Sequence, residues 1–548
     1  MTAQSHSLTR ATNKSRAIRR TYAGVVPAEI NRGTPGHIPV AIIGAGPVGL
    51  AMAGELASRG VSSVILERAH TSSDGSRAIC WSKRTLEILD RLGVADRMYA
   101  AGVTWSVGRV YAGNTTTPLY SFDLAPMKAQ KFPAFINLAQ YHVEEYLVDQ
   151  LTSQSEIDLR WQNELVALGQ GAAGVTLTVQ TPAGTYRLVA DYVVAADGCR
   201  SAVREMLGLH FEGRTFEDHF LIADVRMRAP WEAERRFYFN APFNEGRTAL
   251  MHQQPDDLWR LDFQLGADID REAALQEKNV SAKVEAMLGP SIDFEYEWVS
   301  LYTFQCRRMR QFVHDRVLFV GDAAHLVSPF GARGANGGIQ DVDNLGWKLA
   351  EVLRGDAPRR LLESYDEERG LGADENIGHS TRATDFMTPK TPAARAFQSS
   401  VLALAVDFPF ARALVNSGRL STPCTLGDST LITADTTTFA TPGMQPGAVA
   451  LDAPVHCQGE PSWLLHLLGH DFVCLVFGAT VPSALPPRVR LVVVGRDFID
   501  THGLVAARYD GTPGTVYLIR PDQHIAARWR HPHPEQIRLA WQRGLALT

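Results

Sequence analysis

Three glycines with a fixed spacing separate two apolar segments near residue 40. They form the pattern Gly44-x-Gly46-x-x-Gly49, preceded by a β-branched run at 38–43 and followed by an apolar run that ends at Gly60. In such a pattern the first glycine permits a tight turn, the second lets the backbone approach a pyrophosphate, and the third lets a helix pack closely on a strand. Pro47 lies within this motif, just before the expected helix, whose unpaired N-terminal amides attract phosphate.

The elements around these glycines form a βαβ unit. A strand at 38–43 leads through the glycines into a helix at 50–60, and a second strand at 61–66 ends at Glu67. A carboxylate at that strand end can accept hydrogen bonds from an adenosine ribose, and we assign the adjacent Arg68 to the same site. A chance glycine turn is the alternative, but the strand, the helix and the acid together favour a dinucleotide site.

Two later apolar strands also end in aspartate and glycine. One, at 192–196, leads into Asp197-Gly198, and the other, at 317–320, leads into Gly321-Asp322. A glycine-rich segment at 329–338 then precedes an apolar-periodic helix that Gly355 ends. We expect the backbone amides of this helix start to stabilise negative charge, and the residues concerned are Gly334, Ala335 and Asn336. Asp322 as a simple turn cap is the alternative interpretation.

These three motifs, in this order over residues 38–375, resemble the group A flavoprotein monooxygenases, the aromatic hydroxylases typified by para-hydroxybenzoate hydroxylase. The chain looks more similar to the longer phenol and 3-(3-hydroxyphenyl)propionate hydroxylases. The resemblance implies an FAD enzyme that uses NAD(P)H and O2 to hydroxylate a phenolic or other aromatic substrate. In this family, reduced flavin and oxygen give a C4a-hydroperoxyflavin, which transfers oxygen to the ring.

The resemblance also implies roles for individual residues. Asp322 would bind the ribityl chain of FAD, and Asp197 with Gly198 would lie near FAD and the passing nicotinamide. Arg77 and Gln140 match positions that touch FAD, although a surface charge and a helix cap are their respective alternatives. Where many members have Pro-Pro, this chain has Ser328-Pro329, and the Pro329 carbonyl is the group expected to face the reacting ring.

Candidate substrate contacts come from the segment between the second and third motifs. Its partial alternation predicts an inserted antiparallel sheet. The candidates are Phe237, Tyr238, His252, Trp259 and Gln264. His252 is a candidate catalytic residue because a histidine can help to deprotonate a phenol. A structural histidine and core aromatic residues are the alternatives, and we expect His325, Arg200 and Arg204 to be structural or surface residues.

The fold class that we predict is α/β with three units. A Rossmann-like FAD-binding domain comprises 38–204 and 306–390, the inserted β-sheet domain 205–305, and a thioredoxin-like C-terminal α/β domain 391–548. The last assignment rests on residues 518–522 and 527–528, which resemble the end of that domain in the longer hydroxylases. Because it lacks CxxC, we expect a packing or oligomerisation role. We expect residues 1–37 to be a disordered extension, with an organelle transit peptide as the alternative.

Composition excludes several other classes. The net charge of −5 gives no footprint for nucleic acid, and no apolar run is long enough to span a bilayer. The six cysteines have no metal-ligand spacing, which predicts no metal site and a reducing, cytoplasmic location. A homodimer is an assumption without a sequence signal. The remaining alternatives are a halogenase, whose Trp-x-Trp-x-Ile-Pro segment we do not find, an FAD-dependent reductase or dehydrogenase acting on an aromatic or isoprenoid substrate, and a non-catalytic flavoprotein.

Overall fold

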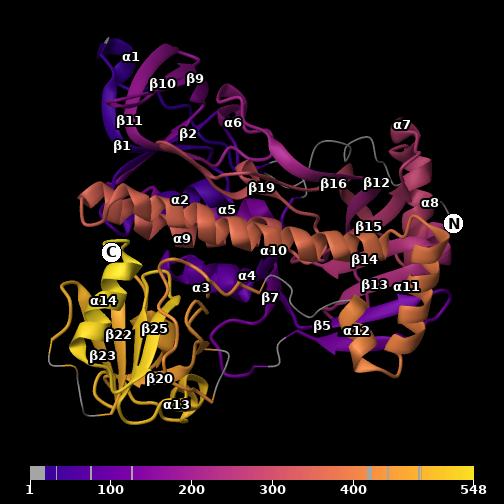
Figure 1. Ribbon diagram of the computed structural model, residues 1–548. Helices are drawn as coiled ribbons and strands as arrows, with labels where there is room; N and C mark the ends of the chain where they lie inside the picture. Colours follow the sequence, from indigo (N-terminus) through magenta and orange to yellow (C-terminus); the bar gives the residue numbers. More distant parts are fainter. Residues whose placement is uncertain are drawn as a thin grey trace.

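The computed structural model describes residues 19–32, 34–73, 77–124, 127–415, 422–440, 444–478, 482 and 484–548. Two eight-stranded sheets, a smaller four-stranded sheet and a set of long helices make up this part of the chain (Figure 1). Within the described residues, no helix combines the length and the apolar content that crossing a membrane requires.

The first sheet carries the glycine motif. Its central strands β1, β2, β8, β11 and β18 are parallel, because helices and long connections return the chain between them. The path through the sheet is β17-β18-β11-β1-β2-β8, and the β9–β10 hairpin extends from β11. The bounds are β1 Gly36–Ile43, β2 Ser63–Glu67, β8 Ile157–Trp161, β9 Glu164–Gly171, β10 Gly174–Thr181, β11 Gly184–Ala195, β17 Val313–His314 and β18 Val317–Phe319.

Helices cover this sheet and pack closely on one another. Helix α2 (Pro47–Ala57) contacts α5 (Gln140–Leu151) and α9 (Gly334–Arg354). Gly346 permits the approach of α9 to α2, because a Cβ there would lie 2.3 Å from Cγ of Glu55. The apolar residues between the layers form the largest core, which includes Ile42, Leu50 and Leu345.

The second sheet is mainly antiparallel and follows the path β19-β16-β12-β15-β14-β13-β5-β6. Helices α7 and α8 cover one of its faces. The bounds are β5 Val107–Ala112, β6 Tyr120–Asp123, β12 Phe211–Arg226, β13 Arg235–Ala241, β14 Arg247–Gln253, β15 Leu258–Gly266, α7 Arg271–Ala274, α8 Glu277–Leu288, β16 Glu295–Met309 and β19 His325–Leu326. We had assigned residues 107–123 to the first unit, but β5 pairs in parallel with β13, so the chain adds an early hairpin to the later sheet.

Helix α10 (Glu363–Met387) runs across the molecule from the C-terminal unit toward the second sheet (Figure 1). Helices α11 (Pro392–Ala405) and α12 (Pro409–Val415) follow it and pack against that sheet. Short elements link the first two sheets: β3 Cys80–Ser82, α3 Lys83–Arg91, α4 Ala95–Ala101, β4 Val103–Trp105, β7 Phe135–Asn137 and α6 Ala202–Met206. Strands β3, β7 and β4 form a separate three-stranded sheet.

The C-terminal unit is built on a four-stranded sheet in the order β23-β22-β24-β25. Strands β22 and β23 are parallel, whereas β24 is antiparallel to both of its neighbours. Apolar clusters line both faces, and one of them includes Trp347 of α9. The bounds are β20 Pro454–Cys457, β21 Glu460–Trp463, β22 Phe472–Phe477, β23 Val489–Val494, α13 Leu504–Tyr509, β24 Thr515–Ile519, β25 Ile525–Arg530 and α14 Pro534–Gly544.

The N-terminal prediction needs a correction. Residues 19–32, which we had placed in a disordered extension, pack on the first sheet and include α1 (Glu29–Arg32). The Tyr22 ring stacks on Trp161 at 4.2 Å, and the Val25 amide donates to the Trp161 carbonyl. These contacts stabilise a segment whose composition alone gave no sign of order. Residues 1–18 and 33 lie outside the described residues.

Candidate active site

The glycine turn between β1 and α2 has the geometry of an anion-binding loop. Gly44 has φ +104°, and a Cβ there would lie 2.6 Å from the Ala196 carbonyl oxygen. A Cβ on Gly49 would lie 2.0 Å from the Gly44 oxygen, whereas a Cβ on Gly46 would meet no atom within 4 Å. Gly46 therefore faces open space, at a helix start that no side chain caps and where Pro47 begins the first turn. That space is where a pyrophosphate would meet unpaired amides.

Glu67 is held beside this turn by the backbone. Its two carboxylate oxygens accept from the Ala45 and Ala69 amides, each at 2.8 Å. This anchoring fixes the carboxylate at the end of β2, and each oxygen keeps a lone pair for a ribose hydroxyl. Arg68, the next residue, is exposed.

Asp322 lies in a single helical turn, Gly321–Ala323, directly after β18. Its side chain is reached by solvent, yet protein surrounds it closely enough that desolvation raises the pKa of the carboxyl, while the charges of His325 and Arg77 act to lower it. Because the charge of Arg77 acts on Asp322, these two residues, distant in sequence, lie near each other in the fold.

Asp197 follows β11 and contributes a second carboxylate. Its Oδ2 accepts from the Val203 amide at 3.1 Å, but its buried Oδ1 has no partner among the described residues. Desolvation raises the pKa of this carboxyl as well. Gly198 has φ +80° and open space at its Cβ position. Arg204 is structural, since it donates to the Ala323 and Cys199 carbonyls and so ties the two aspartate loops together. Arg200 is exposed.

Gln140 begins α5 and braces the segment that carries Arg77. Its Oε1 accepts from the Ala78 amide at 3.3 Å, and its Nε2 donates to Glu144 at 2.8 Å. The helix cap is Ala139, so Gln140 is not the capping residue that we gave as its alternative. Its contacts instead hold the Arg77 segment in place.

Helix α9 starts without a side-chain cap, and Gly334 and Ala335 are partly exposed there. The prediction for Asn336 concerned its backbone amide, and the side chain has a separate, structural role. Its Oδ1 accepts from the Ser82 amide and the Thr85 hydroxyl, and its Nδ2 donates to the Cys80 and Ala332 carbonyls. Only the Asn336 backbone amide is left for a ligand, while the side chain fastens α9 to β3 and α3.

His325 and Asp341 order the loop around Asp322. His325 Nε2 lies 2.7 Å from Asp341 Oδ2, which also accepts from the Gly321 amide at 2.9 Å. Arg369 donates to Oδ1 at 2.6 Å. Burial raises the pKa of Asp341, but the charges of His325 and Arg369 outweigh it and keep the pKa below its usual value. Sequence reasoning missed Asp341, although its place two residues past Ile339, on the expected helix, was visible.

The arrangement fits FAD on observations of this chain alone. Two uncapped helix starts, the open space at Gly46, the unpartnered Asp197 oxygen and the desolvated carboxyl of Asp322 all border one region. In the described part of the chain no group of acidic, histidine or cysteine residues has the geometry of a metal site.

Comparison with known proteins agrees with this geometry. Residues 37–379 match the family described as "FAD binding domain". A flavin-dependent monooxygenase of Mycobacteroides abscessus is 30% identical over 89% of this chain and 96% of its own length. A 3-(3-hydroxy-phenyl)propionate/3-hydroxycinnamic acid hydroxylase of Mycolicibacterium smegmatis is 27% identical over 90% and 91%. The solved aklavinone-11 hydroxylase, in a complex with FAD and aklavinone, shares the fold with a TM-score of 0.77, at 24% identity over 94% of this chain and 100% of that one.

The chain belongs to the group A FAD-dependent aromatic hydroxylases.

The two faces of the hydroxylase's second sheet have different surroundings. On one face, Phe237, His252 and Gln264 point toward the aromatic cluster that includes Phe220 and Phe330. The structure corrects two substrate candidates on the other face. Trp259 is 1% exposed in the core beneath α8, and Tyr238 packs against that same core and stacks on Tyr111 at 5.0 Å. Adjacent residues of a strand point to opposite faces, so Phe237 and Tyr238 could not both be substrate contacts.

Several polar residues of the hydroxylase also lie on the sheet face that carries Phe237. His252 Nε2 lies 3.2 Å from Asp262 Oδ2, and burial together with the charge of Arg235 lowers the pKa of His252 to about 4. Gln264 is engaged, since it donates to Asp218 and accepts from the Thr248 amide. Sequence reasoning missed Arg235, which the strand alternation places on this face with Phe237.

Beside the cofactor region, Ser328 and Pro329 have different environments. Ser328 is buried, and its hydroxyl accepts from Thr384 of α10 at 2.8 Å. Pro329 is exposed, and its carbonyl accepts from the Ala332 amide at 3.1 Å in a turn. The departure from Pro-Pro therefore gives the loop a hydroxyl that binds it to α10.

Proposed function

We propose that this hydroxylase uses NAD(P)H and molecular oxygen to add a hydroxyl group to a phenolic ring. FAD, when bound, supplies the redox chemistry, which comprises reduction by NAD(P)H and activation of oxygen. The protein's task is then to bind both partners, orient the ring and exclude water. The relatives named for hydroxyphenyl acids support a phenolic substrate.

One juxtaposition carries this proposal: the polar and aromatic face of the second sheet meets the loops of the cofactor region. Arg260 of β15 donates from Nη1 to the Arg77 carbonyl at 2.9 Å. The carbonyl of the neighbouring Cys80 accepts from Asn336 at the start of α9 at 2.9 Å. A ring held on this face would therefore lie next to the cofactor, which supports transfer between them.

The contacts support a cofactor role for each of the following residues. Gly44, Gly46, Pro47 and Gly49 would hold the pyrophosphate, and Glu67 the adenosine ribose. In the same proposal, Asp322 accepts hydrogen bonds from the ribityl hydroxyls. The other residues that we assign to the cofactor site are Arg77, Gln140, Arg68, Asp197 and Gly198. The amides of Gly334, Ala335 and Asn336 would meet the negative end of the flavin ring. Pro329 stays our candidate for the carbonyl that faces the reacting ring.

His252 is a candidate for contact with a phenol, but as a hydrogen-bond acceptor. Its pKa of about 4 makes it a weak base that stays neutral near pH 7. Its buried Nδ1 has no partner among the described residues. Such a nitrogen can accept a hydrogen bond from a substrate hydroxyl and so draw electron density into the ring. Phe237 would form part of the apolar wall.

For the architecture, we propose an FAD-binding unit at 38–204 and 306–390, a substrate unit at 205–305 to which the hairpin 107–123 is added, and a C-terminal unit at 391–548. The order β23-β22-β24-β25, with one parallel and two antiparallel pairings, supports a thioredoxin-like C-terminal unit. Its cysteines lack CxxC spacing, which favours a packing role. A cytoplasmic homodimer remains our expectation, for which the free cysteines support the reducing compartment.

The test is a product assay with the FAD-loaded protein. Phenol, 4-hydroxybenzoate and 3-(3-hydroxyphenyl)propionate are each supplied with NADH or NADPH under 18O2. We expect substrate-stimulated NAD(P)H oxidation and a product heavier by one labelled oxygen. Oxidation that yields only hydrogen peroxide, or a product without label, for every phenol tested would contradict the proposal.

A further inference from the structure

A row of charged side chains crosses the face of the second sheet that points toward the cofactor region. In register, Arg235 of β13 lies opposite His252 of β14, His252 opposite Arg260 of β15, and Arg260 opposite Asp224 of β12. Paired residues of neighbouring strands project from the same face. Three nitrogen-bearing side chains therefore stand side by side in the interior of the protein.

Two members of the row have partners. Arg260 donates to Asp224 at 3.0 Å from Nε and to the Arg77 carbonyl from Nη1. His252 lies 3.2 Å from Asp262. Asp224 is therefore paired with Arg260, and Asp262 is hydrogen-bonded to the neutral His252.

Arg235 has no such partner. It is 4% exposed, and within the described residues it forms no ion pair and its Nε has no hydrogen-bond acceptor. Its guanidinium carbon lies over the Phe237 ring, 5.0 Å from the ring centroid. Burial and the nearby charge of Arg260 lower the pKa of Arg235, although the charge of Asp262 acts to raise it. The next residue, Arg236, differs, because it donates to Glu234 at 2.6 Å.

A second observation points to a ligand at the same place. Gln254, two residues beyond His252 along the chain, is 1% exposed, and neither its Oε1 nor its Nε2 has a partner in the described part of the chain. The Nδ1 of His252 is likewise without one. Buried polar groups are ordinarily satisfied, so three such groups on neighbouring positions indicate a missing polar partner.

The place also suits a reacting substrate. Cys80 lies near Arg235, and its carbonyl accepts a hydrogen bond from Asn336 at the start of α9. The aromatic residues Phe220, Phe304 and Phe330 line the continuation of the face. A molecule with one anionic end and an aromatic body would satisfy Arg235 and still reach the cofactor side.

We propose that Arg235 binds an anionic oxygen of the aromatic substrate, with Gln254 and His252 beside it, so that this hydroxylase selects aromatic acids over neutral rings. The inference rests on the proposed function and deepens it by naming the substrate class. The charge-assisted hydrogen bonds of a guanidinium are the strongest that a protein offers to such an oxygen. Both a carboxylate and an ionised phenol carry this chemistry.

The experiment measures binding rather than turnover. The FAD-loaded protein is titrated with matched pairs, benzoate and benzamide, 3-phenylpropionate and 3-phenylpropanamide, and 4-nitrophenolate and nitrobenzene, while the flavin absorbance is followed. In at least one pair, we expect the anion to bind about tenfold to a hundredfold more tightly than its neutral analogue. Preference within the two carboxylate pairs identifies a carboxylate site, and preference only within the third pair identifies a phenolate site.

Two variants make the result specific. Arg235→Met should abolish the preference, and its thermal midpoint should be at or above that of the wild type, because an uncompensated buried charge has been removed. Arg236→Gln, on the opposite face, should keep the preference. A wild type that binds acids and neutral analogues equally, or that responds to none of them, overturns the inference. So does an Arg235→Met protein that keeps the preference or unfolds at a lower temperature.

The outcomes separate this inference from the proposed function. FAD content and labelled product are measured on the same preparations. Acid binding through Arg235 without any labelled product would contradict the hydroxylation but not the anion site. Labelled product from neutral and acidic phenols alike would contradict the anion site alone.

Discussion

Arg520 of the C-terminal unit donates two hydrogen bonds to the Glu368 carboxylate of α10. Nη1 lies 2.6 Å from Oε1 and Nη2 lies 2.9 Å from Oε2, and both side chains are fully buried. Lys348 of α9 donates to the same carboxylate at 2.7 Å. Burial raises the pKa of Glu368, but the charges of Arg520 and Lys348 outweigh it and lower the pKa far below its usual value.

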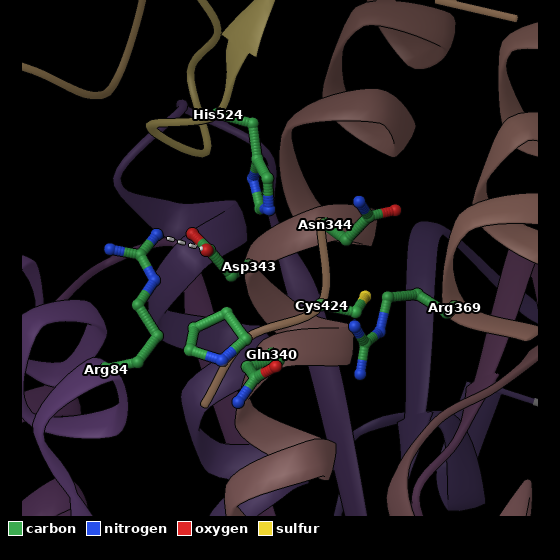
Figure 2. A pocket seen from close by; sticks show the side chains of 8 residues that line it. Arg84, Gln340, Asp343, Asn344, Arg369, Cys424 and His524 are labelled. Carbon is green, nitrogen blue, oxygen red and sulfur yellow. Dashed lines mark hydrogen bonds and ion pairs between the residues drawn. The ribbon is translucent and has the colours of Figure 1, made fainter. Parts of the chain in front are cut away.

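This contact makes the C-terminal unit part of the support for α9. Figure 2 shows the neighbouring pocket, where His524 from the C-terminal unit, Arg84 from α3 and Asp343 from α9 converge. Arg84 donates to Asp343 at 2.7 Å and to the Asp522 carbonyl at 2.9 Å. Helix α9 begins in the cofactor region, so the same helix joins the C-terminal unit to the active site.

Breaking the central pair should destabilise the protein strongly. We expect Arg520→Met to lower the free energy of unfolding by about 3–5 kcal/mol, because Glu368 would keep a buried charge with less compensation. Urea denaturation of the FAD-loaded protein, followed by tryptophan fluorescence, measures this. The control is Arg538→Gln, which removes an exposed pair with Glu535 and should leave the midpoint of urea unfolding nearly unchanged. Equal effects of the two substitutions would refute the role of the buried pair.

The glycines of the first turn should separate binding from folding. Gly46→Ala places a methyl group in the space assigned to the pyrophosphate, and Gly46 has φ −71°, which alanine adopts without strain. We expect a folded protein that purifies with little FAD. Gly49→Ala instead puts its Cβ 2.0 Å from the Gly44 oxygen and should lower the thermal midpoint. A yellow Gly46→Ala protein with a full flavin complement would show that the open space is not the phosphate site.

Asp322→Ala should also leave the protein pale. The substitution removes the carboxylate that we assign as acceptor for the ribityl hydroxyls. It also removes the desolvation cost of the Asp322 carboxylate, because a methyl group carries no charge. We therefore expect weaker FAD binding, by about tenfold or more, without loss of thermal stability in the FAD-free protein. The control is Asp315→Ala, because Asp315 is exposed and pairs with Arg359 outside the cofactor region. Flavin absorbance per protein chain and fluorescence titration with FAD give the comparison.

His252 should make stability depend on pH in a predictable direction. Its pKa is about 4 in the folded protein and about 6.5 in an unfolded chain, so the unfolded state binds more protons between these values. Stability should therefore fall as the pH drops from 6.5 to 4, with a share on the order of 3 kcal/mol from this residue. His252→Gln should show a shallower decline over the same window in urea denaturation. Parallel curves for the two proteins would mean that His252 titrates normally.

The sequence by itself determined the cofactor region. The three glycine- and aspartate-bearing strand ends are local patterns, and parallel strands bring their carboxyl ends to one edge of a sheet, so order and spacing predict that Gly46, Glu67 and Asp322 lie together. The resemblance to the family supplied the role predicted for Asp322. The same reasoning found the inserted sheet, because alternation is visible within one strand.

Only the tertiary structure decided which face of that sheet meets the cofactor. Alternation says that Phe237 and Tyr238 point in opposite directions, but the packing of α8 on one side selects Phe237. The pairing of residues 107–123 with β13, the saturation of the Asn336 side chain and the isolation of Arg235 depend likewise on partners far away in the chain. A sequence displays each residue's own chemistry, whereas burial and the presence or absence of a partner are properties of the folded neighbourhood.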